Sequence, residues 1–281
     1  MMILSFGADS APLTPAAIAL ALPSVVALAC YVAAAMPSER FSAALRKALL
    51  FGWIAQGLSI VIDIAGIGSA TPGARFGFAP ALSVTLWLVL AVYEFESRSM
   101  PLPGARRALA ACGVVVVVLA WLFPGQVHPQ AASLWAPLHW LLGIASYGLF
   151  GVAVLHALLL NRAERRMRRA APVAEAPAQG LPILRLERLT FRFVAAGFLV
   201  LSAAIVLGAW FANPWRWDHK AIFSILGWLV FAGLLAGRRA FGWRGLKAAG
   251  WLYAGAVLLL LAYVGSRFVL EVLLHRAPPM T

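Results

Sequence analysis

The sequence has few charged side chains and almost no cysteine. Only 12% of its 281 residues are Asp, Glu, Lys or Arg, whereas 63% are hydrophobic, and this balance excludes an ordinary water-soluble surface. The two cysteines, Cys30 and Cys112, lie far apart in apolar segments and form no CxxC pair. A disulfide framework, a zinc knuckle and a thiol-exchange site are therefore not expected. Both thiols are expected to be buried and structural.

Motifs for nucleotide binding and for hydrolytic catalysis are also missing. The chain contains no Walker loop, no Gly-rich dinucleotide turn, no paired catalytic carboxylates and no Ser/His/Asp arrangement. Its net charge of +13 would suggest nucleic acid as a partner of a soluble protein. The basic residues, however, lie in short segments between apolar runs, where orientation in a membrane explains them. We expect no nucleic-acid partner and no enzymatic activity of the chain alone.

The sequence does contain long apolar runs of about 20 residues, the length that crosses a bilayer as a helix. They predict an all-α, polytopic membrane protein, a single integral membrane domain over 1–281 with about eight transmembrane helices. The predicted spans are 14–36, 48–69, 79–97, 108–124, 136–161, 191–212, 220–237 and 248–273. An even number of crossings places both termini on the same side.

Orientation follows from the basic residues. One alternating set of predicted loops holds 18 Lys and Arg residues and the other set holds 5, so the positive-inside rule places the first set in the cytoplasm of a bacterial inner membrane. Both termini are then periplasmic. The longest cytoplasmic loop, 161–190, contains RAERRMRRA from residue 162 and continues as APVAEAPAQG. We interpret the first part as a basic extension of the fifth helix that touches anionic lipid head groups, and the second part as a linker.

Histidine and tryptophan gather at the predicted outer face. His139 lies near the outer start of the fifth span, and residues 210–220 read WFANPWRWDHK. An aromatic belt at the membrane interface explains a single Trp, but this connection crowds three Trp, an Asp and a His together. Such a group suits a large planar ligand that carries iron, because haem needs an axial nitrogen and an apolar wall. His139 either ligates iron or forms an interhelical hydrogen bond, and His219 is either a ligand or a solvated loop residue.

Three motifs in order along the chain resemble the CcsA-like cytochrome c assembly family. The stretch WRWDHKAIFSILGWLVFAGLL is similar to the Trp-rich signature of that family, WxWDxKxxxxxxxW, which is carried here by Trp215, Trp217, Asp218, Lys220 and Trp228. The stretch LHWLLGIASYGLFGVAVLHALLL is similar to the family's His-containing helix, with His139 and Tyr147. The stretch FGWRGLKAAGWLYAGAVLLLLAYVGSRFV most resembles the YpjD-like inner membrane protein branch. The resemblance is strongest over 136–273.

The resemblance implies a role in c-type cytochrome biogenesis, in which relatives carry haem across the membrane or present it at the outer face. Apocytochrome c and other maturation components would then be partners, together with membrane lipids. His139 matches the family's membrane histidine and would ligate the haem iron. The other residues expected to bind the cofactor are His219, Trp210, Trp215, Trp217 and Asp218.

The sequence also departs from the family. Residues 235–237 and 265–267 occupy the places of two further family histidines, and His219 stands where Pro is common. A full four-histidine haem relay is therefore not supported. Two alternatives stay open beside haem handling. The first is a transporter, or an accessory subunit of one, for a small solute or ion, with Asp63, Gln56 and His139 along a polar path. The second is a haem-free membrane scaffold.

Overall fold

The computed structural model describes seven stretches of the chain and one further residue, Ile67. The stretches are 15–38, 41–65, 74–97, 103–128, 135–169, 183–211 and 217–269, the last of which includes a break in regular helix at 242–244. By their internal contacts the residues form two compact units, unit 1 (1–134) and unit 2 (135–281). Each unit is described by itself, and the prediction of one membrane domain over 1–281 stays a prediction.

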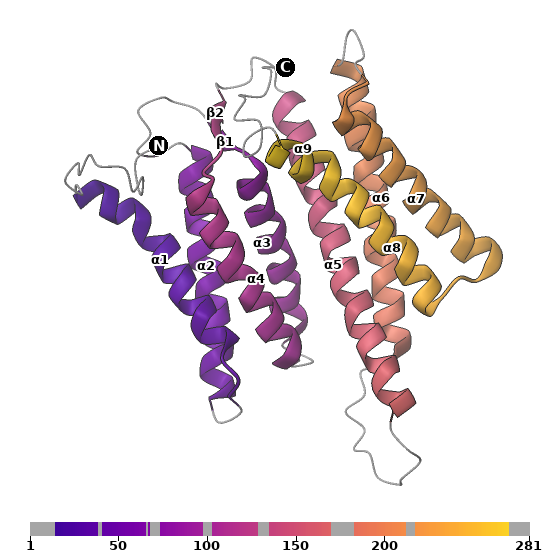
Figure 1. Cartoon of the computed structure of the whole chain (residues 1–281), viewed down its shortest axis with the longest axis horizontal. Coiled ribbons are helices and arrows are strands. Elements are labelled where there is room, and N and C mark those ends of the chain that lie inside the picture. The colour runs from indigo at the N-terminus through magenta and orange to yellow at the C-terminus, as the bar shows by residue number, and fades with distance from the viewer. Residues whose placement is uncertain are drawn as a thin grey trace. The chain divides into compact units, whose positions relative to one another are not determined.

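The described residues of unit 1 form four helices and a small β-ribbon (Figure 1). Helix α1 packs on α2 and α4, and α3 packs on α2 and α4. The three-residue strands β1 and β2 pair antiparallel, with Ala74 opposite His128. The bounds are α1 (Pro15–Ala35), α2 (Ser42–Ala65), β1 (Ala74–Phe76), α3 (Phe78–Ser97), α4 (Pro103–Leu122) and β2 (Gln126–His128).

Glycine and aromatic residues bring the helices of unit 1 close together. The Tyr31 ring is fully buried, and a Cβ added at Gly113 would lie 2.7 Å from its Cδ2 atom. Trp53 and Trp87 join α2 to α3, because each indole Nε1 donates to the backbone carbonyl of the other residue at 3.0 Å. Their rings stack with centroids 5.1 Å apart. Unit 1 is therefore held by contacts that satisfy the polar edges of its aromatic side chains.

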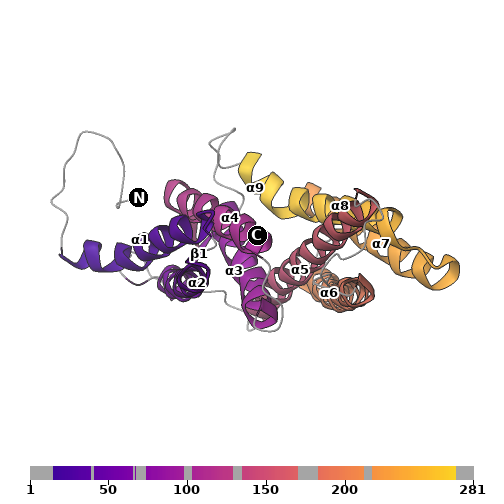
Figure 2. The ribbon, with the colours of Figure 1, turned by 90° about the horizontal axis from the view of Figure 1, so that it is seen from below.

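Unit 2 consists of two helix pairs. Helix α5 packs on α6 and α7 packs on α8, while α5 also contacts α8 and α6 contacts α7 (Figures 1 and 2). Phe150 of α5 and Phe231 of α7 stack at the centre of its core. A Cβ at Gly255 of α8 would lie 2.6 Å from the Phe231 ring, so only glycine lets α8 approach this closely. The bounds are α5 (Trp135–Arg169), α6 (Ile183–Phe211), α7 (His219–Phe241), α8 (Gly245–Leu260), the π-helical turn η1 (Leu261–Gly265) and α9 (Ser266–Phe268).

Apart from β1 and β2, the regular structure of the described residues is helical, and the chain is a multi-pass membrane protein of the all-α class, as predicted. In the described part of the chain, seven helices are long and apolar enough to cross a bilayer, and α1 is a further apolar helix of 21 residues. Large apolar side chains such as Phe51, Leu199 and Val206 are exposed on these helices, as expected for surfaces that face lipid. Each of the eight predicted spans thus has its helix. The periplasmic position of both termini stays a prediction.

The structure corrects three details. First, α6 begins at Ile183, ahead of the predicted start of its span at 191, because a hydrophobic window marks only the apolar part of a helix. At the other end of the predicted loop 161–190, α5 reaches Arg169, which agrees with the expected basic extension of the fifth helix. Second, the β-ribbon was not predicted. Third, Cys30 is only half-buried and Cys112 is exposed, so the predicted burial of both thiols is wrong. A thiol on a membrane helix can face the lipid without a free-energy penalty, so an apolar neighbourhood in the sequence does not imply burial inside the protein.

Candidate functional site

His139 forms a hydrogen bond between two helices of unit 2. Its half-buried imidazole on α5 places Nδ1 2.9 Å from the backbone carbonyl oxygen of Ala204 on α6. Because a carbonyl oxygen can only accept, Nδ1 carries the proton and Nε2 keeps its lone pair. The hydrogen bond and the ligand interpretation of His139 are therefore compatible, since the bond uses one ring nitrogen and leaves the other.

Asp218 begins α7 by capping it. Its backbone is extended, and its Oδ1 atom accepts a hydrogen bond from the Ala221 amide at 2.7 Å, which satisfies one of the amides left open at a helix start. His219 is the first residue of α7 and is exposed. The Asp of the Trp-rich signature thus fixes where α7 starts and places His219 in its first turn.

The tryptophans divide into exposed and packed side chains. Trp210 at the end of α6 is 83% exposed and Trp217 before α7 is 69% exposed, so most of each side chain can meet a ligand or lipid head groups. Trp228, deeper in α7, donates from Nε1 to the Ser202 hydroxyl at 2.8 Å and stacks on Phe198. Trp228 therefore packs α7 against α6. Trp215 lies outside the described residues.

These side chains come from helix ends that meet at one end of unit 2. The start of α5, the end of α6, the start of α7 and the turn η1 lie at that end, which we call the α5–α7 start face (Figure 1). Lys220 of α7 lies over the Tyr263 ring of η1, with Nζ 5.8 Å from the centroid. Tyr147 donates its hydroxyl to the carbonyl of Leu259, just before η1. Such π-turns are often found at functional sites.

The α5–α7 start face suits haem better than a bare metal ion. Among the described residues, no three His, Cys, Asp or Glu side chains are grouped closely enough to hold a metal ion. Haem iron already has four porphyrin nitrogens and needs only axial ligands. His139 offers one such nitrogen, and Trp210 and Trp217 offer accessible aromatic faces on neighbouring helix ends. The residues present therefore fit one axial ligation site.

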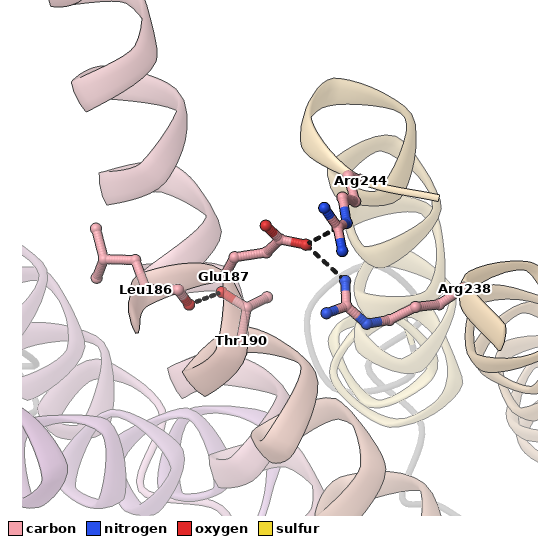
Figure 3. A network of polar contacts seen from close by, with 5 residues as sticks. All are labelled: Leu186, Glu187, Thr190, Arg238 and Arg244. Carbon is pink, nitrogen blue, oxygen red and sulfur yellow. Dashed lines mark hydrogen bonds and ion pairs between the residues drawn. The ribbon is translucent and has the colours of Figure 1, made fainter. Parts of the chain in front are cut away.

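An ion-pair cluster joins the helices at the opposite end of unit 2. One carboxylate oxygen of Glu187 on α6 lies 2.7 Å from Arg238 Nη1 on α7 and 3.4 Å from Nε of Arg244, the residue before α8 (Figure 3). The Arg238 guanidinium also covers the Phe191 ring, with Cζ 3.6 Å from its centroid. Thr190 donates to the carbonyl of Leu186 within α6. This cluster ties three helices together.

Gln56 has a packing role in unit 1. It is 1% exposed, accepts a hydrogen bond from the Tyr31 hydroxyl, and donates to the Ser83 carbonyl and hydroxyl oxygens. Asp63 is half-buried two turns later on α2. A Gln side chain that bonds three helices together is poorly suited to line a transport path. The transporter alternative, with Asp63, Gln56 and His139 along a polar path, stays a prediction.

Sequence reasoning identified His139 but missed the residues that hold it. Ala204 supplies the carbonyl that the imidazole binds, and Gly208 lies against the ring. Neither has a signal in a single sequence, because Ala and Gly are common throughout membrane helices. The cap at Asp218 had a signal, since Asp is a preferred residue directly before a helix.

Comparisons with known proteins agree with the motifs. The family model described as cytochrome C assembly protein matches residues 74–274. A cytochrome c biogenesis protein CcsA from Synechococcus sp. (strain CC9311) is 28% identical over 222 residues, which cover 66% of this chain and 73% of the relative. The protein of the same name from Synechococcus sp. (strain CC9605) is 26% identical over 217 residues, which cover 66% and 71%.

A shorter stretch is more similar. The protein named CcsA from Prochlorococcus marinus (strain NATL1A) is 36% identical over 86 residues, which cover 29% of this chain and 27% of the relative. No solved structure matches the chain significantly. These relatives do not separate the YpjD-like branch from others, so that assignment stays a prediction. Because the family model matches more than half of the chain, this chain belongs to the cytochrome c assembly protein family and functions in cytochrome c biogenesis.

Proposed function

We propose that this protein binds haem at the periplasmic face of a bacterial inner membrane, with Nε2 of His139 as an axial ligand of the iron. The observation that supports this proposal is the hydrogen bond from Nδ1 of His139 to the Ala204 carbonyl. Ligating histidines nearly always donate their other ring N–H to a carbonyl, a carboxylate or water, which fixes the tautomer and the ring direction. His139 has this arrangement in place.

The other predicted residues have separate tasks in the proposal. Trp210 and Trp217 present exposed ring faces as walls for a planar ligand. His219 is the candidate for a second nitrogen, held at the start of α7 by the Asp218 cap. Trp215, which lies outside the described residues, extends the Trp-rich segment in the sequence.

The proposal is one of binding and presentation, without catalysis by the chain itself. Bound haem would supply iron that takes axial nitrogen ligands and vinyl groups that react with the thiols of apocytochrome c. Apocytochrome c and other maturation components are then the proposed partners. The residues of this chain would hold haem in place and direct its accessible edge away from the helices.

Spectroscopy of the purified protein tests the proposal. We expect full-length protein, expressed with ample haem and purified in detergent, to show a Soret band. His139→Ala should lose or shift this band. Leu138→Ala is the matched control, because Leu138 is the neighbouring residue on α5 and is 39% exposed.

Each alternative has its own outcome. A wild-type protein without a Soret band would contradict haem binding. Crosslinking of that pigment-free protein to a periplasmic partner would then indicate a scaffold. Solute or ion flux in proteoliposomes that depends on Asp63 would indicate a transporter.

A further inference from the structure

We infer that Gly208 is a positioning residue for His139, because the missing side chain at this position exposes the Ala204 carbonyl to the imidazole. The inference rests on the proposed function for its role in haem binding, but its geometry is independent of haem. The inference explains why the imidazole of His139, near the start of α5, has one orientation and one tautomer.

The close approach of the two helices is measured at Gly208. A Cβ built on this residue would lie 2.8 Å from Cε1 of His139, 3.3 Å from Nδ1 and 3.6 Å from Nε2. The Cε1 edge of the ring, between its two nitrogens, therefore points at the Gly208 backbone. Any residue with a Cβ atom at position 208 would therefore force the ring to move.

Helix geometry explains why the glycine controls the hydrogen bond. The carbonyl of Ala204 points along α6 toward Gly208, four residues later, because helical carbonyls point to the C-terminus. Side chains tilt the opposite way, toward the N-terminus, and cover the preceding turn. A side chain at position 208 would thus cover the carbonyl that accepts from His139 Nδ1 at 2.9 Å.

A methyl group at position 208 should move the imidazole and spare the fold. The atoms that it would meet belong to the end of a side chain with two rotatable bonds, and no backbone atom of another helix is among the three nearest atoms. The Ala204 carbonyl keeps its helical partner, so no buried polar group of the backbone is abandoned. The ring would lose its anchor, and Nδ1 and Nε2 would both become free to carry the proton.

The test compares two glycines of unit 2. Gly208→Ala introduces the clash, whereas Gly143→Ala introduces the same methyl group one turn from His139 on α5, where a Cβ meets nothing within 4 Å. Both variants are purified as full-length protein and checked for monodispersity and for helical content by circular dichroism. We expect both to fold.

The first readout is haem binding. Loss of the group that orients a ligating histidine typically weakens metal binding about 10–100-fold, so we expect Gly208→Ala to lose affinity for haem by that factor and to shift its Soret band. Gly143→Ala should match wild type. Wild-type affinity and spectrum in Gly208→Ala would overturn the inference.

The second readout needs no haem. Nitrogen-15 spectra of the haem-free protein, with the His139 signals identified by their absence in His139→Gln, report which ring nitrogen carries the proton. We expect the Nδ1–H tautomer in wild type and in Gly143→Ala, and a mixture of tautomers in Gly208→Ala. An Nε2–H tautomer in wild type would overturn the inference. The expected tautomers in a protein that never binds haem would support the positioning role and contradict only the proposed function.

Discussion

Replacing Gln56 with Leu should destabilise unit 1, because Gln56 links three helices. Its Oε1 atom accepts from the Tyr31 hydroxyl at 2.5 Å, and its Nε2 atom donates to the Ser83 hydroxyl at 3.0 Å and to the Ser83 carbonyl at 3.2 Å. Tyr31 is 0% exposed and Ser83 is 6% exposed. A Leu side chain of similar size would fill the space but would leave the two hydroxyl groups without this partner.

The expected magnitude follows from the number of bonds. Side-chain hydrogen bonds between membrane helices are worth about 0.6 kcal/mol on average and at most about 1.7 kcal/mol. With three bonds lost, Gln56→Leu should lower the free energy of unfolding by about 2 kcal/mol. Tyr31→Phe removes one bond and should cost about 0.6 kcal/mol. The double variant should cost less than the two single variants together, by about that same bond energy.

The assay is reversible unfolding of the full-length protein in mixed micelles by increasing detergent denaturant, followed by circular dichroism. Thr85→Val on α3 is the control, because the Thr85 hydroxyl donates to the Ala81 carbonyl within its own helix at 2.8 Å. This control should change stability by less than about 0.5 kcal/mol. A Gln56→Leu protein within that margin of wild type, or strict additivity in the double variant, would refute the reasoning.

Three further variants test contacts of unit 2. Glu187→Gln should lower stability by about 1–2 kcal/mol, because it removes the charged partner of the partly buried Arg238; Arg244→Gln should cost less than about 0.5 kcal/mol, since Arg244 is 68% exposed. Equal losses in the two variants would contradict this ranking. Trp228→Phe should cost about 1 kcal/mol by losing the bond to Ser202, while the haem content of the folded fraction stays at the wild-type level. Loss of haem without loss of stability would place Trp228 at the ligand instead.

The membrane-spanning helices could be predicted from the sequence because they face lipid, whereas the ends of these helices were harder to predict. A span must present apolar side chains for about 20 residues, and this requirement is visible in the sequence without any tertiary information. Helix ends are under no such requirement. The basic run after residue 161 could still be read as an extension of the fifth helix, and α5 reaches Arg169, since arginine is a good helix former once the chain has left the hydrocarbon. The start of α6 at Ile183, ahead of the predicted start at 191, was missed.

The Trp-rich segment shows which part of a site can be predicted from sequence. Trp217 and Trp228 are equivalent in the signature, yet one is 69% exposed and the other is packed between helices and bonded to Ser202. The difference depends on which face of α7 meets α6. The spacing of the signature alone does not contain that information.

Two glycines of unit 2 differ in the same way. Gly143 and Gly208 both lie inside apolar helices of unit 2, and nothing in their neighbouring residues marks one as functional. They differ only in what faces them across the helix, because a Cβ at Gly143 meets nothing and a Cβ at Gly208 meets the His139 ring. A glycine in a membrane helix is therefore informative only when its partner is known. Position 208 has such a partner, and that partner is the histidine that both the motifs and the hydrogen bond to Ala204 single out.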